Sequence, residues 1–573
     1  MQIKRRQISS LSTGLPPELH PVLQRVYAAR QVTDAAQLEH NLKHLLPWQQ
    51  LKDIDRAVAL LVQVLRENQR ILIIGDFDSD GATSSALAVK ALQAFGAQQV
   101  DFLVPNRFEY GYGLTPEIVE VALTRQPDLI ITVDNGISSL QGVAVAKQHG
   151  VRVLITDHHL PADQLPAADA IVNPNQPGDT FPGKSMAGVG VIFYVMMALR
   201  AALREQGWFE EQGINEPNLA TFLDLVALGT VADVVPLDYN NRILVAQGLA
   251  RIRAGQCCHG IAALLTVSGR SKEKISTTDI GFCVAPRLNA AGRLDDMSIG
   301  ISCLLSETVD GAMTLARELD HLNRERREIE QGMREQAFAW LETQTMAETT
   351  LPVALCLYEA DWHEGVIGIL AARVKDKWHR PVIAFAATDN GMIKGSARSI
   401  PGLHIRDALD AVAAHHPGLI TKFGGHAMAA GLTIAEKDFP DFRQAFCAEV
   451  ARHLSEEDLQ GQVLSDGELH AAELTLELAE NLREGGPWGQ GFPEPVFDGV
   501  FEIINRRIVG EKHLKLELRP ADGRQLMDAI AFNTVDTDWP ADVSRVELAY
   551  KLDVNEFQGV KRAQLLVEHI EPV

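Results

Sequence analysis

The sequence has six cysteines, and no two of them are spaced as Cys-x-x-Cys. This absence disfavours zinc ribbons and thioredoxin-type redox chemistry, and it fits a reducing cytoplasm. Long apolar runs are also missing: the longest nearly uncharged stretch, residues 186–199, is too short to span a bilayer and predicts a buried helix. No apolar core follows the basic residues at the amino terminus, so we expect no secretory signal, no membrane association and a cytoplasmic location.

An excess of positive charge is likewise absent, because the formal net charge is −22. Charge alone therefore argues against non-specific coating of nucleic acid. It does not exclude a basic cleft, since salt confines the influence of each charge to about 8–10 Å. A chain of 573 residues with 46% hydrophobic and 22% charged residues is typical of a globular protein with three or four domains.

Three short apolar runs, residues 71–74, 129–133 and 151–155, are each followed by acidic residues. Such runs, separated by helix-like stretches, predict parallel strands of an α/β fold, whose carboxyl ends meet at one edge. Five carboxylates gathered there repel one another unless cations lie among them, so the pattern predicts a two-metal hydrolase. The side chains concerned are, in chain order, Asp76, Asp78, Asp80, Asp134, Asp157, His158 and His159.

Three alternatives account for these acidic groups less well. The segment 76–81 opens like a calcium loop, but an EF-hand needs glutamate at its twelfth position, which is Leu87 here. A haloacid-dehalogenase site would use the first aspartate as a nucleophile, and it has no use for an Asp-His-His triplet. Aspartates that cap helices could explain one group but explain poorly three groups at successive strand ends.

Asp233 lies inside the apolar run 228–236 and needs a partner there, for which a metal is the natural choice. With it, the motifs follow an order that resembles the DHH phosphoesterase family. The resemblance covers nearly the whole chain, and within the family the chain is similar to the single-strand-specific 5′→3′ exonucleases. The segments that carry it are 76–81, 133–136, 157–159, 229–233, 106–113, 286–293, 395–399, 423–427 and 486–491.

The resemblance implies two divalent cations, Mn²⁺ or Mg²⁺, which would activate a water molecule for attack on a phosphodiester. Many family members carry a histidine ligand at the start of the first motif, and Asp76 takes its place here. Asp134 would bridge the two ions, Asp157 would orient an imidazole, and His159 would face the substrate phosphate as donor or general acid. The implied ligands are Asp76, Asp78, Asp80, Asp134, His158 and Asp233.

The predicted fold is a multidomain α/β protein. After a lead-in at 1–55, a parallel-sheet DHH catalytic domain covers 56–305, and a long connecting helix covers 306–345 because its apolar residues recur at helical spacing. A smaller α/β domain of the DHHA1 type covers 346–452. Several short alternating strands then predict an OB-like nucleic-acid-binding β-barrel at 453–573.

Further residues would hold the strand, and each has a plain structural alternative. Arg107, Ser396 and Arg398 are implied to capture a terminal 5′ phosphate, whereas an arginine beside glycines is often a loop salt-bridge former. Tyr110 and Tyr112 are predicted to be platforms on which bases stack. Arg287, Asn289 and Arg293 are predicted to contact the DNA backbone, or else merely to tie a loop to the core. Gly424, Gly425 and His426 are predicted to lie beside a phosphate, or else in a plain turn.

The implied activity is hydrolysis of single-stranded DNA from a 5′ end to 5′-mononucleotides in DNA recombination and repair. The implied partners are single-strand-binding protein and a recombination helicase. Pyrophosphatases, oligoribonucleases and cyclic-dinucleotide phosphodiesterases share the metal core, but they have less need for an added barrel. A non-catalytic replication scaffold should lack some ligands, and this chain retains the acidic and histidine positions.

Overall fold

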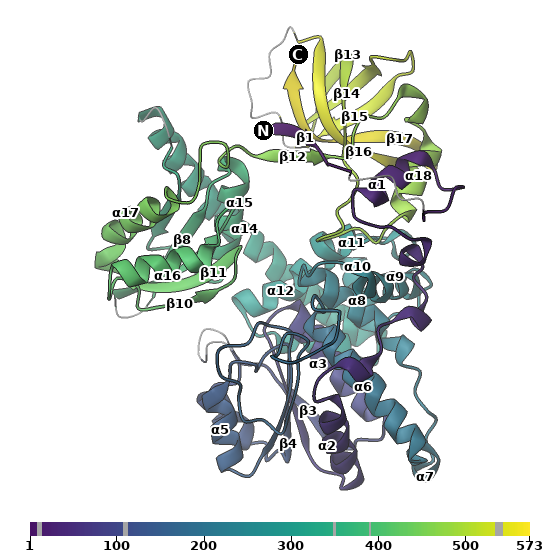
Figure 1. Cartoon of the computed structure of the whole chain (residues 1–573), viewed down its shortest axis with the longest axis vertical. Coiled ribbons are helices and arrows are strands. Elements are labelled where there is room, and N and C mark those ends of the chain that lie inside the picture. Colours follow the sequence, from purple (N-terminus) through teal and green to yellow (C-terminus); the bar gives the residue numbers. More distant parts are fainter. Residues whose placement is uncertain are drawn as a thin grey trace. The chain divides into compact units, whose positions relative to one another are not determined.

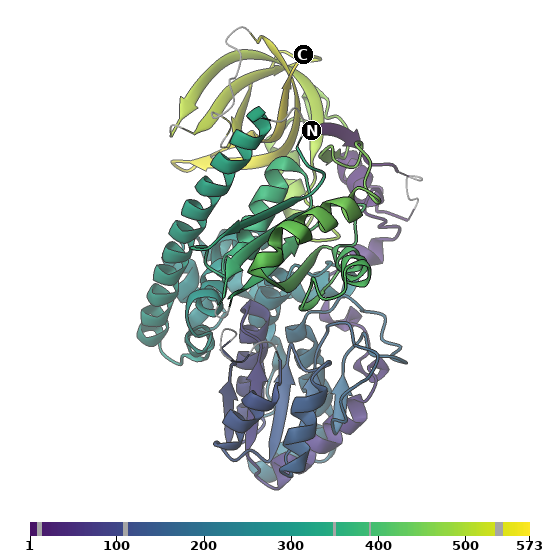
Figure 2. The same ribbon diagram turned by 90° about the vertical axis from the view of Figure 1, so that its left-hand side faces the viewer.

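The computed structural model describes residues 1–8, 14–106, 110, 113–347, 351–388, 391–510, 512–532, 534 and 543–573. Within these residues the chain forms two compact units. One unit comprises Met1–Lys4 and Arg324–Leu464, and the other comprises Arg5–Asn323 and Ser465–Val573. Many elements of both units are labelled in Figure 1, and Figure 2 shows the same ribbon from a second side.

A five-stranded parallel sheet in the order β3-β2-β4-β5-β6 forms the centre of the predicted DHH region. The three apolar runs are its neighbouring strands β2, β4 and β5, so the predicted α/β sheet is confirmed. All residues of β2 and β4 are buried, as in a sheet covered on both faces. The strands are β2 (Ile71–Gly75), β3 (Val100–Leu103), β4 (Leu129–Val133), β5 (Arg152–Thr156) and β6 (Ala170–Val172).

Alternate side chains of each strand enter different cores, because successive residues of a strand point to opposite faces. Ile71 and Ile73 join the core that contains α2, α3 and α6, whereas Leu72 and Ile74 join the core of α4 and α5. The sheet is therefore covered on both faces. These helices are α2 (Ile54–Arg66), α3 (Ser79–Ala94), α4 (Pro116–Leu123), α5 (Leu140–Gln148) and α6 (Gly188–Glu205).

Helix α6 occupies the stretch predicted to be a buried helix, and most of its residues are indeed buried. It packs against α3, which also contacts α8 (Leu223–Ala232). None of the helices that the structure describes combines the length and the apolar character needed to cross a membrane. The further helices of this part are α7 (Trp208–Gln212), α9 (Tyr239–Arg253), α10 (His259–Val267), α11 (Thr277–Asp279), α12 (Ala285–Leu294) and α13 (Ser298–Leu305).

The carboxy-terminal strands close into a barrel in the order β13-β14-β15-β17-β16, which confirms the predicted OB-like barrel. In β14, buried residues alternate strictly with half-buried ones, as its sequence pattern indicates. The strands are β13 (Phe497–Val509), β14 (His513–Pro520), β15 (Met527–Ala531), β16 (Arg545–Phe557) and β17 (Val560–Pro572). Helix α18 (Leu476–Glu484) packs against β16 and β17.

The lead-in has a structural role that its sequence did not reveal. Helix α1 (Pro21–Ala28) is followed by Arg30, whose guanidinium pairs with the buried carboxylate of Asp466 at 2.8 Å. The Tyr27 ring stacks on Trp488, with ring centroids 6.0 Å apart, and its hydroxyl donates to the carbonyl of Gly485. The lead-in therefore ties the start of the chain to the segment just before the barrel.

The other unit holds a mixed sheet in the order β10-β11-β9-β8-β7, in which only β7 and β8 run parallel. The predicted long helix is α14 (Val309–Ala347), whose residues from Arg324 onward belong to this unit. The remaining elements are β1 (Gln2–Arg5), which pairs with β12 (Gln462–Ser465), β7 (Leu355–Glu359), β8 (Val382–Ala387), β9 (Met392–Arg398), β10 (Lys422–Gly425), β11 (Ala429–Ala435), α15 (Ile367–Trp378), α16 (Ile405–His415) and α17 (Phe439–Val450).

Candidate metal centre

The ends of three adjacent strands bring the predicted acidic groups together. Strand β2 leads to Asp76, β4 to Asp134 and β5 to Asp157, and β4 lies between the other two. Parallel strands end at the same edge, so these side chains converge there. Asp233 joins them from the carboxyl end of α8.

Ligand-type atoms of the described residues lie close enough to share metal ions. Three groups have such atoms within 4.8 Å of one another, and Asp134 belongs to two of these groups. The His158 Nε2 atom lies 3.1 Å from Asp134 Oδ1 and 3.5 Å from Asp233 Oδ2. The groups are Asp76, Asp78 and Asp134; Asp80, His158 and Asp233; and Asp134, His158 and His159.

The start of α3 arranges two of these carboxylates. Asp78 caps the helix, because its Oδ1 accepts the backbone N–H groups of Asp80 and Gly81 at 2.9 and 3.0 Å. The Asp80 carboxylate is buried and accepts the amides of Gly188 and Val189 at the first turn of α6, at 2.6 and 2.9 Å. The carboxylates are therefore held in place by backbone groups.

Glycine is required at position 188 by this close approach. A Cβ atom there would lie 2.6 Å from the Cβ of Asp134, a distance that real Cβ atoms essentially never show. Asp134 itself has a φ of 62°, in the left-handed region that few residues other than glycine adopt. Backbone strain of this kind is concentrated at functional sites.

The electrostatics of the cluster favour cations. Burial, followed by the charge of Asp78, raises the pKa of Asp80 to about 7. Burial and the surrounding carboxylates raise the pKa of Asp134 well above its ordinary value, and the same causes act on Asp233. These acids cannot all ionise in the bare protein, and a divalent cation would relieve the repulsion. Five carboxylates and one imidazole form a donor set that suits Mn²⁺ or Mg²⁺.

Asp157 is placed to orient the histidines. Its Oδ1 accepts the His159 Nδ1–H at 2.7 Å and the His158 amide at 2.7 Å, and its Oδ2 accepts the Ile137 amide at 2.9 Å. Burial acts to raise the pKa of Asp157, but these bonds and the two histidine charges lower it overall. With both oxygens engaged, the carboxylate is suited to holding the His159 ring rather than to binding metal.

Two of the three predicted contacts on α12, Arg287 and Asn289, brace the structure. The Arg287 guanidinium pairs with Asp320 through Nε at 2.9 Å and Nη2 at 2.8 Å, and it also donates to the carbonyl of Cys283. Asn289 Oδ1 accepts hydrogen bonds from both the amide and the hydroxyl of Ser79 at 2.8 Å. It therefore supports the acidic loop, residues 76–80. Arg293 is half-buried on the same helix. These contacts favour the loop-tying alternative for Arg287, and its contact with DNA stays a prediction.

The contacts predicted for the smaller domain line up across its sheet. Gly424 pairs with Gly431, and Gly431 pairs with Ser396, in one row across β10, β11 and β9. Arg398 Nη1 donates to Ser396 Oγ at 3.1 Å, and a Cβ on Gly368 at the start of α15 would meet both side chains at 2.9 Å. Glycines, a guanidinium and a helix N-terminus together suit a phosphate.

Gly425 and His426 follow this row directly, with Gly425 at a φ of 143°. Tyr110 is half-buried against the core of α4 and α5, where it has less freedom to stack on a base than an exposed ring would have. Arg107 and Tyr112 lie outside the described residues.

Comparison with known proteins then decides the family. Residues 70–230 match the model of the DHH family N-terminal domain, residues 350–452 match the DHHA1 domain and residues 465–569 match the RecJ OB domain. The chain is 54% identical over its full length to the single-stranded-DNA-specific exonuclease RecJ of Escherichia coli K12, of which it covers 99%. The chain belongs to the RecJ family.

Solved RecJ structures from Thermus thermophilus share the fold. The complex with Mn²⁺ matches with a TM-score of 0.80 at 30% identity, over 98% of this chain and 79% of that one. The complex with Mg²⁺ matches with a TM-score of 0.74 at 29% identity, over 98% of this chain and 78% of that one.

The RecJ-type centre also uses residues that the sequence analysis missed. Asn173 Nδ2 donates to the carbonyl of His159 at 2.9 Å, and Asn175 Nδ2 donates to that of His158 at 2.6 Å. The side-chain amide of Asn135 donates to the carbonyls of Ile74 in β2 and Val133 in β4. The Asn-Pro-Asn triplet at 173–175 directly follows β6 and is the one local signal that could have indicated the first pair.

Proposed function

We propose that this chain is a metal-dependent exonuclease that hydrolyses single-stranded DNA 5′→3′ to 5′-mononucleotides in recombination and repair. The observation that carries the proposal is the convergence of five carboxylates and an imidazole at one sheet edge. Full-length similarity to an exonuclease named for single-stranded DNA supports the substrate. The matched OB domain supports a nucleic-acid polymer over a small phosphate ester.

The ligands that we propose for two divalent cations, Mn²⁺ or Mg²⁺, are Asp76, Asp78, Asp80, Asp134, His158 and Asp233. When bound, such cations generate a nucleophilic water near neutral pH and neutralise charge on the phosphoryl oxygens. The chain itself contributes the fixed geometry. Backbone amides hold Asp80, the helix cap holds Asp78, and Asn289 supports the loop that carries both.

His159 is the residue that we propose donates to the substrate phosphate or protonates the leaving group. Burial acts to lower the pKa of His159, but the hydrogen bond that its Nδ1–H donates to Asp157 and the nearby carboxylates raise it to about 9. The bond to Asp157 therefore favours the charged form of the imidazole. A charged donor attracts an anionic phosphate and carries the proton that a leaving alkoxide needs.

We expect Asp157→Asn to slow hydrolysis by about 10- to 100-fold, as is typical when the partner of a positioned histidine is lost. The alkaline limb of the pH profile should also move to lower pH. The pKa of His159 falls without its carboxylate partner, so the protonated form is lost earlier as the pH rises. The measurement is kcat/KM between about pH 6 and pH 10. Exposed Asp163→Asn is the matched control, and an unchanged profile for Asp157→Asn would contradict the role.

Asn289→Ala should weaken metal binding by roughly tenfold, because the acidic loop loses the acceptor of the Ser79 amide. The Mn²⁺ concentration that gives half-maximal hydrolysis measures this effect. Ser79→Ala is the matched control: it removes the hydroxyl bond and keeps the amide bond, so its effect should be smaller. Equal metal dependence of Asn289→Ala and the wild type would show that the loop needs no such support.

The row of Ser396, Gly431 and Gly424, together with Arg398, is the site that we propose for the terminal 5′ phosphate. Arg107 is proposed to assist. Capture of a free end explains exonuclease action, and a single polarity follows when that end is the 5′ end. The region 465–569 is proposed to guide the single strand, as OB-folds do.

The decisive experiment uses labelled single- and double-stranded DNA, with and without Mn²⁺, and a pair of oligonucleotides blocked at one end or the other. We expect single strands to be degraded only with metal, and the 5′-blocked strand to resist. Equal degradation of the two blocked strands would remove the polarity. No hydrolysis at saturating Mn²⁺ would instead favour a non-catalytic scaffold.

The proposed cellular setting is the cytoplasm, with single-strand-binding protein and a recombination helicase as partners. A helicase would supply the single strands that the enzyme consumes, and single-strand-binding protein would keep them extended. Both proposals rest on the family resemblance. Stimulation of hydrolysis by either partner on structured DNA is the measurement that tests them.

A further inference from the structure

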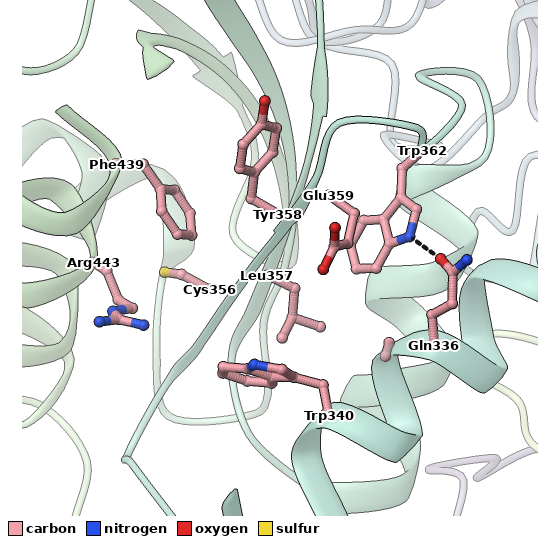
Figure 3. Close-up of a pocket in the computed structure, with 10 residues that line it drawn as sticks. Gln336, Trp340, Cys356, Leu357, Tyr358, Glu359, Trp362, Phe439 and Arg443 are labelled. Atoms are coloured by element: carbon pink, nitrogen blue, oxygen red, sulfur yellow. Dashed lines mark hydrogen bonds between the residues drawn. The ribbon is translucent and has the colours of Figure 1, made fainter. Parts of the chain in front are cut away.

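Two features of the molecule lie outside the metal centre itself. One is a cavity of about 230 Å³ beside strand β7, with α14 on one side and α17 on the other, which Figure 3 shows. The buried Trp362 donates its indole N–H to Gln336 there at 2.8 Å, and Phe439 packs against Tyr358 with ring centroids 5.6 Å apart. These side chains contact one another and contribute no ligand to the metal centre. The other feature is the turn at 489–492, which contacts the segment after a proposed ligand.

That ligand is Asp233, at the end of α8, where the chain passes through the connection 234–238 into α9. The body of α8 is fixed one turn earlier, because a Cβ atom on Gly229 would lie only 2.3 Å from Thr83 Oγ1 on α3. Such close packing holds the helix but leaves its last turn to be held from the other end. The contacts of the connection therefore determine where the Asp233 carboxylate lies, 3.5 Å from the His158 ring.

The connection begins with a strained residue. Val234 has a φ of 61°, in the left-handed region, where a β-branched side chain is a genuine outlier. At the end of a helix this conformation usually belongs to glycine. The Val234 side chain is 61% exposed, so its burial does not offset the strain. Strained residues persist where the surrounding structure holds them, so contacts beyond Val234 must fix the chain.

Three hydrogen bonds fix the backbone just beyond the strained residue. The Leu237 amide donates to the carbonyl of Gln490 at 2.7 Å, and Arg242 donates to the Leu237 carbonyl at 3.1 Å. The side chain of Asn241 donates to the carbonyl of Pro236 at 2.9 Å. Asn241 and Arg242 lie in α9, directly after the connection. Of these three bonds, only the one to Gln490 ties the connection to a distant segment.

The distant segment is a tight turn that fits closely against the connection. Gly489 and Phe492 exchange backbone hydrogen bonds at 2.9 and 3.1 Å, and Gly491 at the corner has a φ of 71°. A Cβ atom on Gly491 would lie 3.1 Å from the Cβ of Pro236. One on Gly489 would lie 2.7 Å from Leu237 Cδ1. Glycine therefore allows the turn to approach the connection at both positions.

The turn itself rests on a rigid base. Trp488 is buried and stacks on Tyr27 and Phe492, with ring centroids 6.0 and 5.1 Å apart. Its indole N–H donates to the carbonyl of Leu482 at 2.9 Å, and its own carbonyl accepts the Thr277 hydroxyl at 2.6 Å. Stacking and buried hydrogen bonds together hold Trp488 in one position. The turn is thus anchored on groups outside the connection.

We propose that Gly491 is a positioning residue of the metal centre, because its turn holds the connection 234–238 and thereby keeps Asp233 opposite His158. This role rests on the proposed function, since it requires Asp233 to be a metal ligand. Asp233 belongs to only one of the three ligand groups of the described residues. Displacement of the turn should therefore weaken the binding of one cation and leave the other nearly unchanged.

The test measures Mn²⁺ binding to the full-length protein by calorimetry and by the electron paramagnetic resonance signal of free Mn²⁺. The wild type should bind two ions. Gly491→Ala should weaken one of them by roughly 10-fold, as the loss of an outer partner of a ligand typically does. The cause is that a left-handed alanine is strained and its Cβ presses on Pro236. Hydrolysis of single-stranded DNA by this variant should recover as the Mn²⁺ concentration is raised.

Thr277→Val provides a second variant, which keeps the size of the side chain and removes the hydroxyl bonded to the Trp488 carbonyl. It should weaken the same ion by a smaller factor than Gly491→Ala does. Thr277→Ser keeps the hydroxyl, so it should bind both ions as the wild type does. These two variants test the role of the turn even when Gly491→Ala fails to fold.

Gly213→Ala is the matched control. Gly213 has a φ of 66°, and within the described part of the chain nothing lies within 4 Å of the Cβ that alanine would add. The substitution therefore adds similar backbone strain without a contact, and both ions should bind as in the wild type. The role of the turn is overturned if Gly491→Ala and Thr277→Val leave Mn²⁺ binding unchanged, or if they weaken both ions equally. A wild type that binds no Mn²⁺ would instead contradict the proposed function itself.

Discussion

Asp134→Asn is expected to abolish hydrolysis of single-stranded DNA while it raises the apparent melting temperature of the metal-free protein. Both effects have one cause, because Asp134 belongs to two of the three ligand groups and is also a buried acid whose pKa is raised by burial and by the charges of four other carboxylates. The amide has the shape of the carboxylate but carries no charge. It therefore holds cations poorly and no longer repels Asp80, Asp78 and Asp76.

The expected loss in kcat/KM is at least a thousandfold, which corresponds to about 4 kcal/mol of transition-state stabilisation. The melting temperature in EDTA should rise by roughly 2 °C or more, since a change of 1 kcal/mol shifts larger domains by about that amount. Binding of single-stranded DNA in EDTA should change little, because the proposed strand contacts lie on other residues. Melting curves measure the melting temperature, and filter binding measures the affinity for single-stranded DNA.

Asp163→Asn provides the matched control for Asp134→Asn. Asp163 is exposed and lies outside the cluster, so its substitution removes one negative charge without touching the site. We expect wild-type hydrolysis and an unchanged melting temperature for this control. An Asp134→Asn enzyme that cleaves at the wild-type rate would show that the ligand assignment is wrong.

The second large effect is a pH dependence of stability that metal reverses. The pKa of Asp80 is raised to about 7, and those of Asp134 and Asp233 are raised well above the ordinary value. Between about pH 4 and pH 7 the folded protein therefore binds more protons than the unfolded chain, and stability falls as the pH rises through this window. Protonated His159 also stabilises the folded protein, because its pKa of about 9 there lies above the ordinary value. This contribution is complete below the ordinary pKa of histidine and is lost as the pH rises to 9.

In EDTA, the apparent melting temperature should consequently fall from about pH 5 to pH 8, by roughly 1 kcal/mol of stability per pH unit for each proton involved. Asp157 does not change this sign, because its lowered pKa affects stability only in more acidic solution. With saturating Mn²⁺ the trend should reverse, since cations and protons compete for the same carboxylates.

Thermal unfolding across this pH range, with EDTA and with Mn²⁺, provides the measurement. Calorimetry in two buffers of different ionisation enthalpy should also detect proton release when Mn²⁺ binds. Asp134→Asn should flatten the slope in EDTA, because it removes one of the titrating groups. A metal-free protein whose stability increases steadily from pH 5 to pH 8 would contradict the proposed charge repulsion.

Much of the architecture was predictable because it is encoded by local periodicity. The apolar runs before Asp76, Asp134 and Asp157 are the parallel strands β2, β4 and β5. The stretch at 186–199 is the buried helix α6, and the alternation in β14 belongs to a barrel strand. Burial patterns with a period of two or of about 3.6 residues depend only on neighbours in the sequence. They can therefore be recognised without knowledge of the fold.

Contacts between distant segments were not predictable in the same way. The amides that hold Asp80 belong to Gly188 and Val189, more than a hundred residues away. The asparagines that hold His158 and His159 follow β6 rather than β5, and Arg287 forms an ion pair with Asp320. Each of these contacts requires two segments to be brought together by packing, which no local pattern specifies.

The sequence by itself determined the classes of element, the ligand types and their order, because hydrophobic periodicity and acid–histidine chemistry are properties of the chain. Only the tertiary structure decided which carboxylates share a site and which arginine forms a salt bridge within the protein. These outcomes depend on how strands are ordered and how helices pack. A hydrogen bond or an ion pair forms only where that packing brings its two partners within reach.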